Sequence, residues 1–293
     1  MKALKFFASF VAMALTGGVA FAADVEPVTD LGLSGLMNIS AGAFSYEGTD
    51  DSTDTTDAII SGFGAVNIPL GDSFSAQLDA FGETVLVRGD DVDAYSDMFG
   101  IGGHLSWRNY DSGLVGLFGG LGEGSPTDEE PWNGGWVGIE AQAYLGDFTL
   151  YGQAAWLLIS SSDDDEEGFD RDSFLVRGVG RYFVTDDAKI EAEVSYMEGG
   201  DVIDGDDDGK AWEWGVNGML RLSEQMPIYG TLAYRGADYD ATTEDDEGES
   251  HSLMAGVTFL FGGSSLKEND RMGATLDSPT TVLRTSGAFS ELD

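Results

Sequence analysis

Residues 60–83 alternate between apolar and polar side chains in two arms that a short turn separates. The even-numbered positions from Ile60 to Ile68 and from Phe74 to Ala80 form an apolar or small face, with Pro69–Ser73 between the arms. A period of two predicts β-strands, and Pro and Gly between them predict a turn. The opposite face of the second arm carries polar residues in mid-strand: Gln77, Asp79 and Glu83. Both arms approach the ten or so residues that a tilted strand needs to cross a bilayer, so we expect one hairpin of a membrane barrel.

The same alternation returns along the rest of the chain. It marks further strands at 33–46, 99–108, 115–121, 136–143, 148–156, 174–182, 189–196, 212–221, 228–235 and 252–261. The connections between successive strands alternate strictly between short and long. This is the pattern of an outer-membrane barrel with short periplasmic turns and long extracellular loops. We expect an all-β fold, a closed antiparallel transmembrane β-barrel with twelve strands, and keep ten or fourteen as alternatives.

Aromatic residues on the apolar faces give an independent indication of a membrane. Phe74, Trp107, Phe148 and Tyr182 lie beside short turns, whereas Trp156, Tyr196, Trp212, Trp214 and Tyr234 lie beside long loops. A barrel that spans a membrane carries a girdle of aromatic residues at each of the two interfaces, with an aliphatic band between them. A soluble β-sandwich would not sort its core aromatics toward both strand ends.

The N-terminus has the pattern of a secretory signal peptide, for which we expect residues 1–22. Lys2 and Lys5 precede a mostly apolar run from Phe6 to Val19, and Ala20-Phe21-Ala22 is an A-x-A cleavage site. No later window approaches the roughly 18 consecutive apolar residues of a transmembrane helix. A chain of this kind that enters a membrane must therefore do so as a closed barrel, which also satisfies its backbone in lipid.

Net charge excludes one class of partner. Removing residues 1–22 takes two of the 14 basic residues and no acid, which leaves 12 against 53 acidic residues and a formal charge of −41. Such a chain repels phosphate backbones, so we expect no nucleic acid partner. The sequence has no cysteine, which excludes disulfides and thiolate chemistry.

The last predicted strand resembles the terminal β-signal of outer-membrane proteins. In Met254–Phe261 a glycine, Gly256, is followed by Phe259 and Phe261 at alternate positions. Over residues 31–261 the chain is similar to porin-like β-barrel proteins of the Gram-negative outer membrane. The resemblance implies localisation in the cell outer membrane and recognition by the barrel-assembly machinery during biogenesis. It also implies contact with outer-membrane lipids and lipopolysaccharide.

The chain departs from that family after the last strand. Family members usually stop at the terminal aromatic residue, whereas this chain continues to Asp293 with Lys267, Arg271 and Arg284. We expect residues 262–293 to form a polar, poorly ordered periplasmic tail, and residues 23–30 a periplasmic lead-in. The alternative is that the tail inserts into the lumen as a plug.

On each strand, alternate positions lie opposite the apolar face, and we predict that the ionisable residues at these positions face inward and line the pore. They are Asp79, Glu83, His104, Arg108, Glu140, Arg177, Arg181, Lys189, Glu191, Glu193, Glu213, Arg221 and Arg235. Five of them, Arg177, Arg181, Lys189, Arg221 and Arg235, lie on consecutive strands and form what we term the basic wall. One interpretation is a transverse field across a narrow, water-filled or gated pore. The other is that the charges pair across the lumen and close it, since twelve strands fall between filled and open barrels.

The long loops are rich in Asp and Glu. We expect no required cofactor, but Ca²⁺ or Mg²⁺ could bind these acidic extracellular loops and bridge them to lipopolysaccharide phosphates. The most specific stretch begins like an EF-hand, with candidate metal ligands at Asp204, Asp206 and Asp208. Its closing Glu is absent, because position 215 is Gly, so this site is weak. A solvated acidic surface that attracts cations is the simplest interpretation.

Enzymatic motifs are missing from the sequence. Its two histidines are His104 and His251, and it has neither a G-x-S-x-G elbow nor a metal-binding histidine pair. We therefore expect a protein that is not an enzyme. The sequence favours a porin-like channel for passive diffusion of small hydrophilic solutes or ions. The alternative is a non-conducting structural or cell-surface interaction barrel with cation-binding acidic loops.

Overall fold

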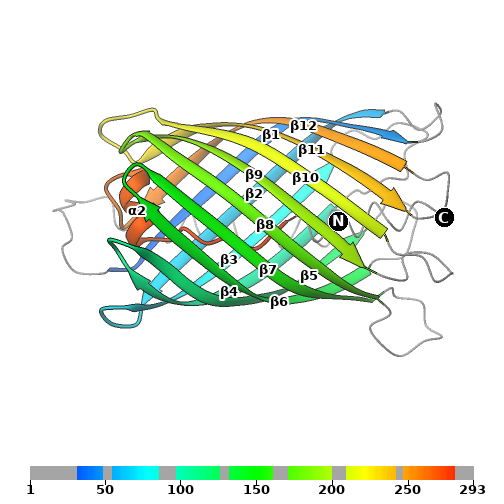
Figure 1. The fold of residues 1–293 in the computed structure, drawn as a ribbon. Coiled ribbons are helices and arrows are strands. Elements are labelled where there is room, and N and C mark those ends of the chain that lie inside the picture. The colour runs from blue at the N-terminus through cyan, green and yellow to red at the C-terminus, as the bar shows by residue number, and fades with distance from the viewer. Residues whose placement is uncertain are drawn as a thin grey trace.

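The computed structural model describes residues 32–48, 55–85, 97–125, 132–160, 171–199, 209–241 and 247–280, and shows a closed barrel of twelve antiparallel strands (Figure 1). The strands are β1 (Ser34–Gly48), β2 (Thr55–Pro69), β3 (Phe74–Val85), β4 (Asp97–Asn109), β5 (Gly113–Ser125), β6 (Trp132–Leu145), β7 (Phe148–Ser160), β8 (Arg171–Thr185), β9 (Ala188–Gly199), β10 (Gly209–Arg221), β11 (Ile228–Ala241) and β12 (Glu247–Phe261). The expected fold class is confirmed. The expected signal peptide and lead-in, residues 1–30, lie outside the described residues.

Pairing of the first and last strands closes the barrel. Strand β1 pairs with β2 on one side and with β12 on the other, in a register that sets Gly35 opposite Phe261. Every other strand pairs with its neighbours in sequence, so the strand order follows the chain around the ring. Among the described residues this gives twelve strands, and the alternatives of ten and fourteen are wrong.

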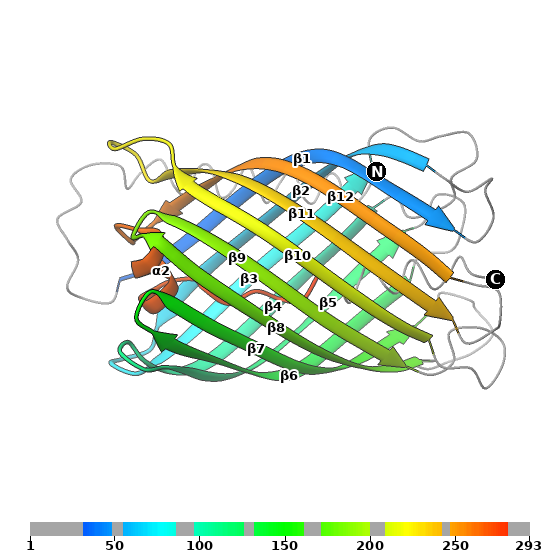
Figure 2. The same cartoon turned by 45° about the horizontal axis from the view of Figure 1, so that its top comes forward.

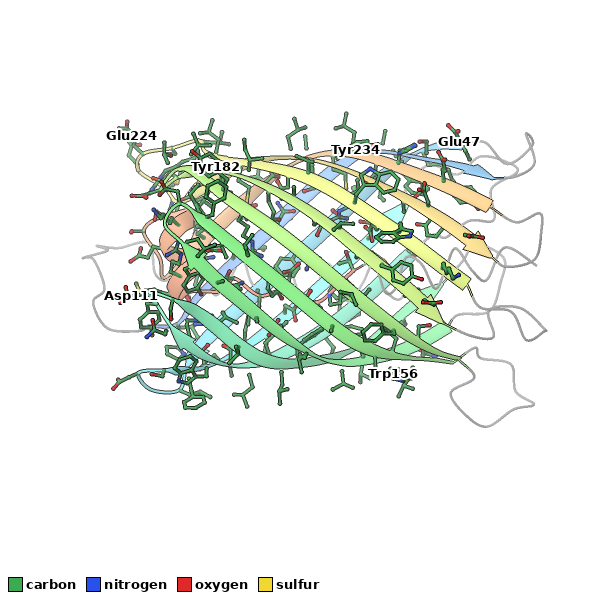
Figure 3. The ribbon with its side chains drawn as sticks, viewed as in Figure 1. Glu47, Asp111, Trp156, Tyr182, Glu224 and Tyr234 are labelled. Atoms are coloured by element: carbon green, nitrogen blue, oxygen red, sulfur yellow. The ribbon has the colours of Figure 1, made fainter. Side chains whose placement is uncertain are left out.

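The period-two pattern places apolar side chains on the outside of the barrel. Leu121, Val137 and Leu117 are each more than 60% exposed, as expected where lipid rather than protein covers the wall. Figure 3 shows Tyr182 near the end with the short turns, and Trp156 and Tyr234 toward the other end. All three are at least 40% exposed. The structure thus has an aromatic residue at each edge of the apolar band, as two membrane interfaces require.

The short turns gather at one end of the barrel together with a short helix, α2 (Leu266–Met272) (Figures 1 and 2). Ser265 caps this helix, since its hydroxyl accepts a hydrogen bond from the backbone N–H of Glu268 at 3.1 Å. No helix in the described part of the chain is long and apolar enough to span a bilayer.

The chain reverses direction after β12 and enters the barrel. Gly262 has φ +73°, and a Cβ at this position would collide with the backbone of Leu33 and Ser34, so Gly fits the reversal. Beyond α2 the chain runs extended through the lumen, as the red trace in Figures 1 and 2 shows. We term residues 262–280 the plug.

The plug corrects our first expectation for the tail. Over residues 262–280 the chain is not a poorly ordered periplasmic extension, and the alternative of a lumenal plug is the one found. The physical reason is that Leu266, Ala274 and Leu276 are buried in the lumen, while polar groups between them meet polar groups of the wall. Residues 281–293 lie outside the described part.

Candidate functional site

The lumen and its plug form the candidate site, and Asp270 anchors the plug near the short-turn end. Its carboxylate, 5% exposed, accepts hydrogen bonds from Thr149 Oγ1 at 2.6 Å and from Arg181 Nη1 at 2.8 Å. It also accepts one from Thr275 Oγ1 at 3.1 Å, within the plug itself. Nearby, Leu266 packs in an apolar cluster of the barrel wall with Phe183, Tyr229 and Leu260. Burial of a carboxylate requires such partners, so this contact fixes the plug in one position.

Exposed contacts add to the anchor at the mouth of the barrel. Lys267 Nζ lies 2.7 Å from Asp147 Oδ1 in the turn between β6 and β7. This hydrogen bond and the Lys267 charge hold the pKa of Asp147 below its ordinary value. Arg271 donates to the carbonyl of Gly146 at 2.8 Å, and its guanidinium lies 4.5 Å from the centre of the Tyr144 ring. The turn residues thus bind the outer face of α2.

Polar side chains of the wall bind the backbone of the extended part of the plug. Arg108 Nη1 donates to the carbonyl of Gly273 at 2.9 Å. Gln77 accepts from the backbone N–H of Leu276 at 3.2 Å and donates to its carbonyl oxygen. The side-chain amide of Gln77 thus bonds both the N–H and the C=O of Leu276, as the backbone of a neighbouring β-strand would. It satisfies a backbone that would otherwise be buried without partners.

The end of the plug meets both acidic and basic groups of the wall. The backbone N–H of Ser278 donates to Asp79 Oδ2 at 2.7 Å. On the opposite side Arg177 Nη1 lies 2.8 Å from Asp277 Oδ2, and Gln153 donates to the Asp277 carbonyl at 2.8 Å. The plug therefore bridges β3 with β7 and β8 across the lumen.

His104 links two acids in the middle of the wall. Its Nδ1 lies 2.9 Å from Glu140 Oε1 and its Nε2 lies 3.5 Å from Asp79 Oδ1. Tyr151 donates to the other oxygen of Glu140 at 2.7 Å. All of these groups are buried. Because Asp79 also binds Ser278, the network connects β3, β4, β6 and β7 to the plug.

The basic wall forms mainly local ion pairs. Arg177 pairs with Glu193 and Arg181 with Glu191, both on the adjacent strand β9. Lys189 Nζ lies 3.0 Å from Glu191, and Arg221 Nη1 lies 3.0 Å from Asp187 in a short turn. The contacts of Arg235 with Glu83 and Glu193 are longer, at 3.9 Å each. Glu213, the remaining predicted lumen residue, is 7% exposed on β10. Neighbouring acids thus neutralise much of the wall, and the plug contributes further acids.

A cavity of about 220 Å³ remains beside the plug. The extended part of the plug contacts the side formed by β3 to β8, whereas the cavity is also lined by residues of β1, β2, β10, β11 and β12. Its polar lining includes Asn38, Ser40, Lys189, Glu191 and Arg235. The open part of the lumen is therefore off-centre.

The remaining predicted residues fall in different places. Gly256 faces the lumen on β12, where a Cβ would be 2.8 Å from Thr231 Oγ1, while Phe259 and Phe261 lie on the outward parity and are partly exposed. Asp204, Asp206 and Asp208 lie outside the described residues. Within the part that the structure describes, no group of three or more His, Asp or Glu residues is arranged to hold a metal ion.

Sequence reasoning missed the neutral partners of the plug. Thr149, Gln142 and Gln153 bind it, but their inward positions alone gave no sign of a ligand. A usable signal was the alternation of residues 274–278, Ala-Thr-Leu-Asp-Ser, which continues the period-two pattern beyond the last strand.

Comparison with known proteins identifies the fold. No family model and no curated protein matches the sequence. Among solved structures, the COG4313 outer membrane channel from Pseudomonas putida F1 aligns with a TM-score of 0.53 and 15% identity, covering 81% of this chain and 100% of that one. The translocator domain of the autotransporter NalP from Neisseria meningitidis gives 0.44 and 13%, covering 86% and 98%. The CymD monoaromatic hydrocarbon channel gives 0.45 and 9%, covering 79% and 89%. Of these three, the first has a TM-score above 0.5, and we compare the fold with it alone.

Proposed function

We propose that this chain, which has the fold of a porin-like Gram-negative outer-membrane β-barrel, is a plugged channel for passive diffusion of small hydrophilic solutes or ions. The observation that carries the proposal is the cavity of about 220 Å³ beside a plug that is held by side-chain contacts. A barrel that serves only as a scaffold can fill its lumen with its own side chains. Here a separate segment occupies part of the lumen beside an open cavity, so its release would open a path through the barrel.

The plug contacts are of a type that can break and reform. Most are hydrogen bonds between the wall and the plug, and one of the anchoring ion pairs, between Lys267 and Asp147, is exposed at the mouth. Partial release would widen the cavity along β9 to β12. Full release would remove the plug partners of Arg108, Arg177 and Arg181. Water in the lumen can then accept the hydrogen bonds that these guanidinium groups donate.

We also propose a preference for cations. The predicted basic wall would favour anions only if its charges were unpaired. Arg177, Arg181 and Lys189 instead pair with Glu191 and Glu193 on the same wall. The acidic long loops then set the sign of the potential at the mouth and concentrate cations there.

A second candidate is a non-conducting structural or cell-surface barrel with cation-binding acidic loops. The observation that favours it is the extent of the plug contacts, which reach from the turn residue Asp147 to Asp79 in the middle of β3. On this proposal the plug never leaves, and the loops contact lipopolysaccharide or another cell surface.

Conductance of the folded protein in planar bilayers separates the two candidates. We would compare the full mature chain with a variant truncated after Phe261. We would also test an Asp79→Cys, Ser278→Cys double variant, which can lock the plug because the chain has no other cysteine. We expect the oxidised double variant to be silent, the reduced form to recover intermittent openings, and the truncated barrel to conduct steadily. The reversal potential in a salt gradient should indicate cation preference.

The controls are chosen so that a loss of folding is not mistaken for a closed channel. Each variant should keep the heat-dependent gel mobility of a folded barrel. A correctly folded barrel without the plug that passes no current would refute the channel and leave the structural candidate.

A further inference from the structure

The loop-side half of the lumen contains a cluster of apolar side chains beside buried polar groups such as Glu83. Phe81, Met98, Phe118, Trp136 and Leu157 belong to one cluster that also includes Leu175 and Met197, with Tyr46 and Phe63 packed against it. Each of the strands β1 to β11 contributes at least one member, and all lie on the inward parity. We term this ring the apolar layer. Outer-membrane barrels that hold water usually have a polar interior, so the layer needs an explanation.

The apolar layer adjoins the cavity beside the plug. Phe63, Phe81 and Met98 belong to the layer and also line the cavity. The Phe81 and Trp136 rings lie 6.1 Å apart between centres, and Phe118 stacks on His104 at 5.7 Å. A solute that passes from the loops toward the plug therefore meets aromatic and thioether groups together with the carboxylate of Glu83.

The size of the cavity limits what it can hold. An apolar cavity of about 150 Å³ in another protein binds benzene, and drug-sized ligands need roughly 300 Å³ or more. A volume of about 220 Å³ therefore suits one ring with a short substituent, or a short branched chain. Aromatic and methionine side chains pack well against such bodies.

The polar part of the same cavity supplies partners for one hydrogen-bonding group. Asn38, Ser40 and Thr231 form a chain of neutral donors and acceptors, with Asn38 Nδ2 3.4 Å from Thr231 Oγ1. Arg235 lines the cavity as well, and within the described residues its ion pairs with Glu83 and Glu193 exceed hydrogen-bond length. The guanidinium can thus donate to a ligand oxygen without breaking a hydrogen bond to either carboxylate.

We propose that the apolar layer and the cavity form a binding site for small amphipathic molecules, with an aromatic or short alkyl body and one polar end. The apolar body of the ligand lies against Phe63, Phe81 and Met98. Its polar end meets Arg235 and the neutral chain of Asn38, Ser40 and Thr231. This inference rests on the channel proposed above and adds to its hydrophilic solutes a class that binds in the lumen, namely amphipathic solutes of this shape.

Binding of 4-fluorobenzyl alcohol to the full mature protein in lipid nanodiscs tests the proposal. Fluorine NMR titration measures binding, with empty nanodiscs as the blank and 2-deoxy-2-fluoroglucose as a hydrophilic probe. We expect saturable binding of the alcohol and none of the sugar. The variant Met98→Gln places an amide in the layer and should weaken binding by about tenfold, the usual order for a polar group set against an apolar ligand.

Two further variants separate the site from general effects on the barrel. Met98→Leu keeps the layer apolar and should bind within about twofold of the parent protein. Met226→Gln makes the same chemical change as Met98→Gln, but in the exposed turn between β10 and β11, and should leave binding unchanged. Folding of each variant is checked by its heat-dependent gel mobility.

The outcomes are decisive in either direction. Equal probe signals in loaded and empty nanodiscs overturn the proposal, as does equal binding by Met98→Gln and Met226→Gln. Absent probe binding combined with higher conductance of Met98→Gln would also overturn it and make the layer a dewetted barrier to ions. The NMR titration requires no ion flow, so a channel that fails to conduct does not affect its result.

Discussion

Replacing Asp270 with Ala should release the plug far more often than breaking an exposed contact on the same helix. Asp270 is 5% exposed and accepts hydrogen bonds from Thr149, Arg181 and Thr275. Removing one partner of a buried ion pair typically costs about 3–5 kcal/mol. Arg181 keeps its contact with Glu191 at 2.7 Å, so the lower end, about 3 kcal/mol, applies here. This corresponds to roughly a hundredfold larger population of released plug.

Cleavage by trypsin after Arg271 measures that population. The barrel strands resist proteolysis, and when opening is fast relative to cleavage, the cleavage rate follows the fraction of released plug. The comparison variant is Lys267→Gln, which breaks the exposed pair with Asp147. Because exposed pairs contribute little, we expect less than about a fivefold increase for that variant. Asp270→Asn keeps the shape of the side chain but loses its charge. Its rate of cleavage after Arg271 should fall between those of Asp270→Ala and Lys267→Gln.

The reasoning is refuted if the ranking fails. Equal cleavage rates after Arg271 in Asp270→Ala and Lys267→Gln would mean that burial of the carboxylate does not hold the plug. Fragment masses identify the cleaved bond, and gel mobility verifies that the barrel itself stays folded.

Three further predictions concern pH, assembly and the loops. The Lys267 partner lowers the pKa of Asp147, so this contact stabilises the docked plug fully above the ordinary carboxyl value of 3.8 and is lost as the pH falls below it. Plug release in acid should therefore rise, and in Asp147→Asn this part of the pH dependence should be absent. Phe261→Ala should lower the yield of folded barrel in the outer membrane, measured by gel mobility of membrane fractions, while Leu253→Ala on the same outward face should not. If the loops bind Ca²⁺, chelation should lower the melting temperature of the protein. Replacing Asp204, Asp206 and Asp208 together with Asn should abolish that shift.

Local alternation was sufficient to predict the wall of the barrel. In β9 the order Lys189, Ile190, Glu191 puts the apolar side chain on one face and the charged ones on the other, whatever the rest of the chain does. Counting the alternating stretches predicted twelve strands, with ten or fourteen as alternatives, and the closed barrel has twelve. The pairing of β1 with β12 had no local signal, because their residues are about two hundred positions apart, but closure requires it.

The filling of the lumen could not be read from the sequence in the same way. The position of His104 predicted that it faces inward, but not that Asp79 and Glu140, from two other strands, would both approach it. Likewise, the predicted basic wall exists as a set of residues, yet Arg177 and Arg181 pair with Glu193 and Glu191 on the next strand. Register between strands decides such pairs, and register is not visible in one segment.

The sequence by itself determined which side chains face lipid and at which end the short turns gather, and it favoured twelve strands over ten or fourteen. These properties depend on neighbours one or two positions away, through a backbone geometry that every strand shares. Only the tertiary structure decided that the tail occupies the lumen. Gln77 meets Leu276, and Asp79 meets Ser278, across 199 residues of chain. Contacts of that separation form only when the closed wall brings twelve polar faces around one space, and the plug is the part of the chain that satisfies them.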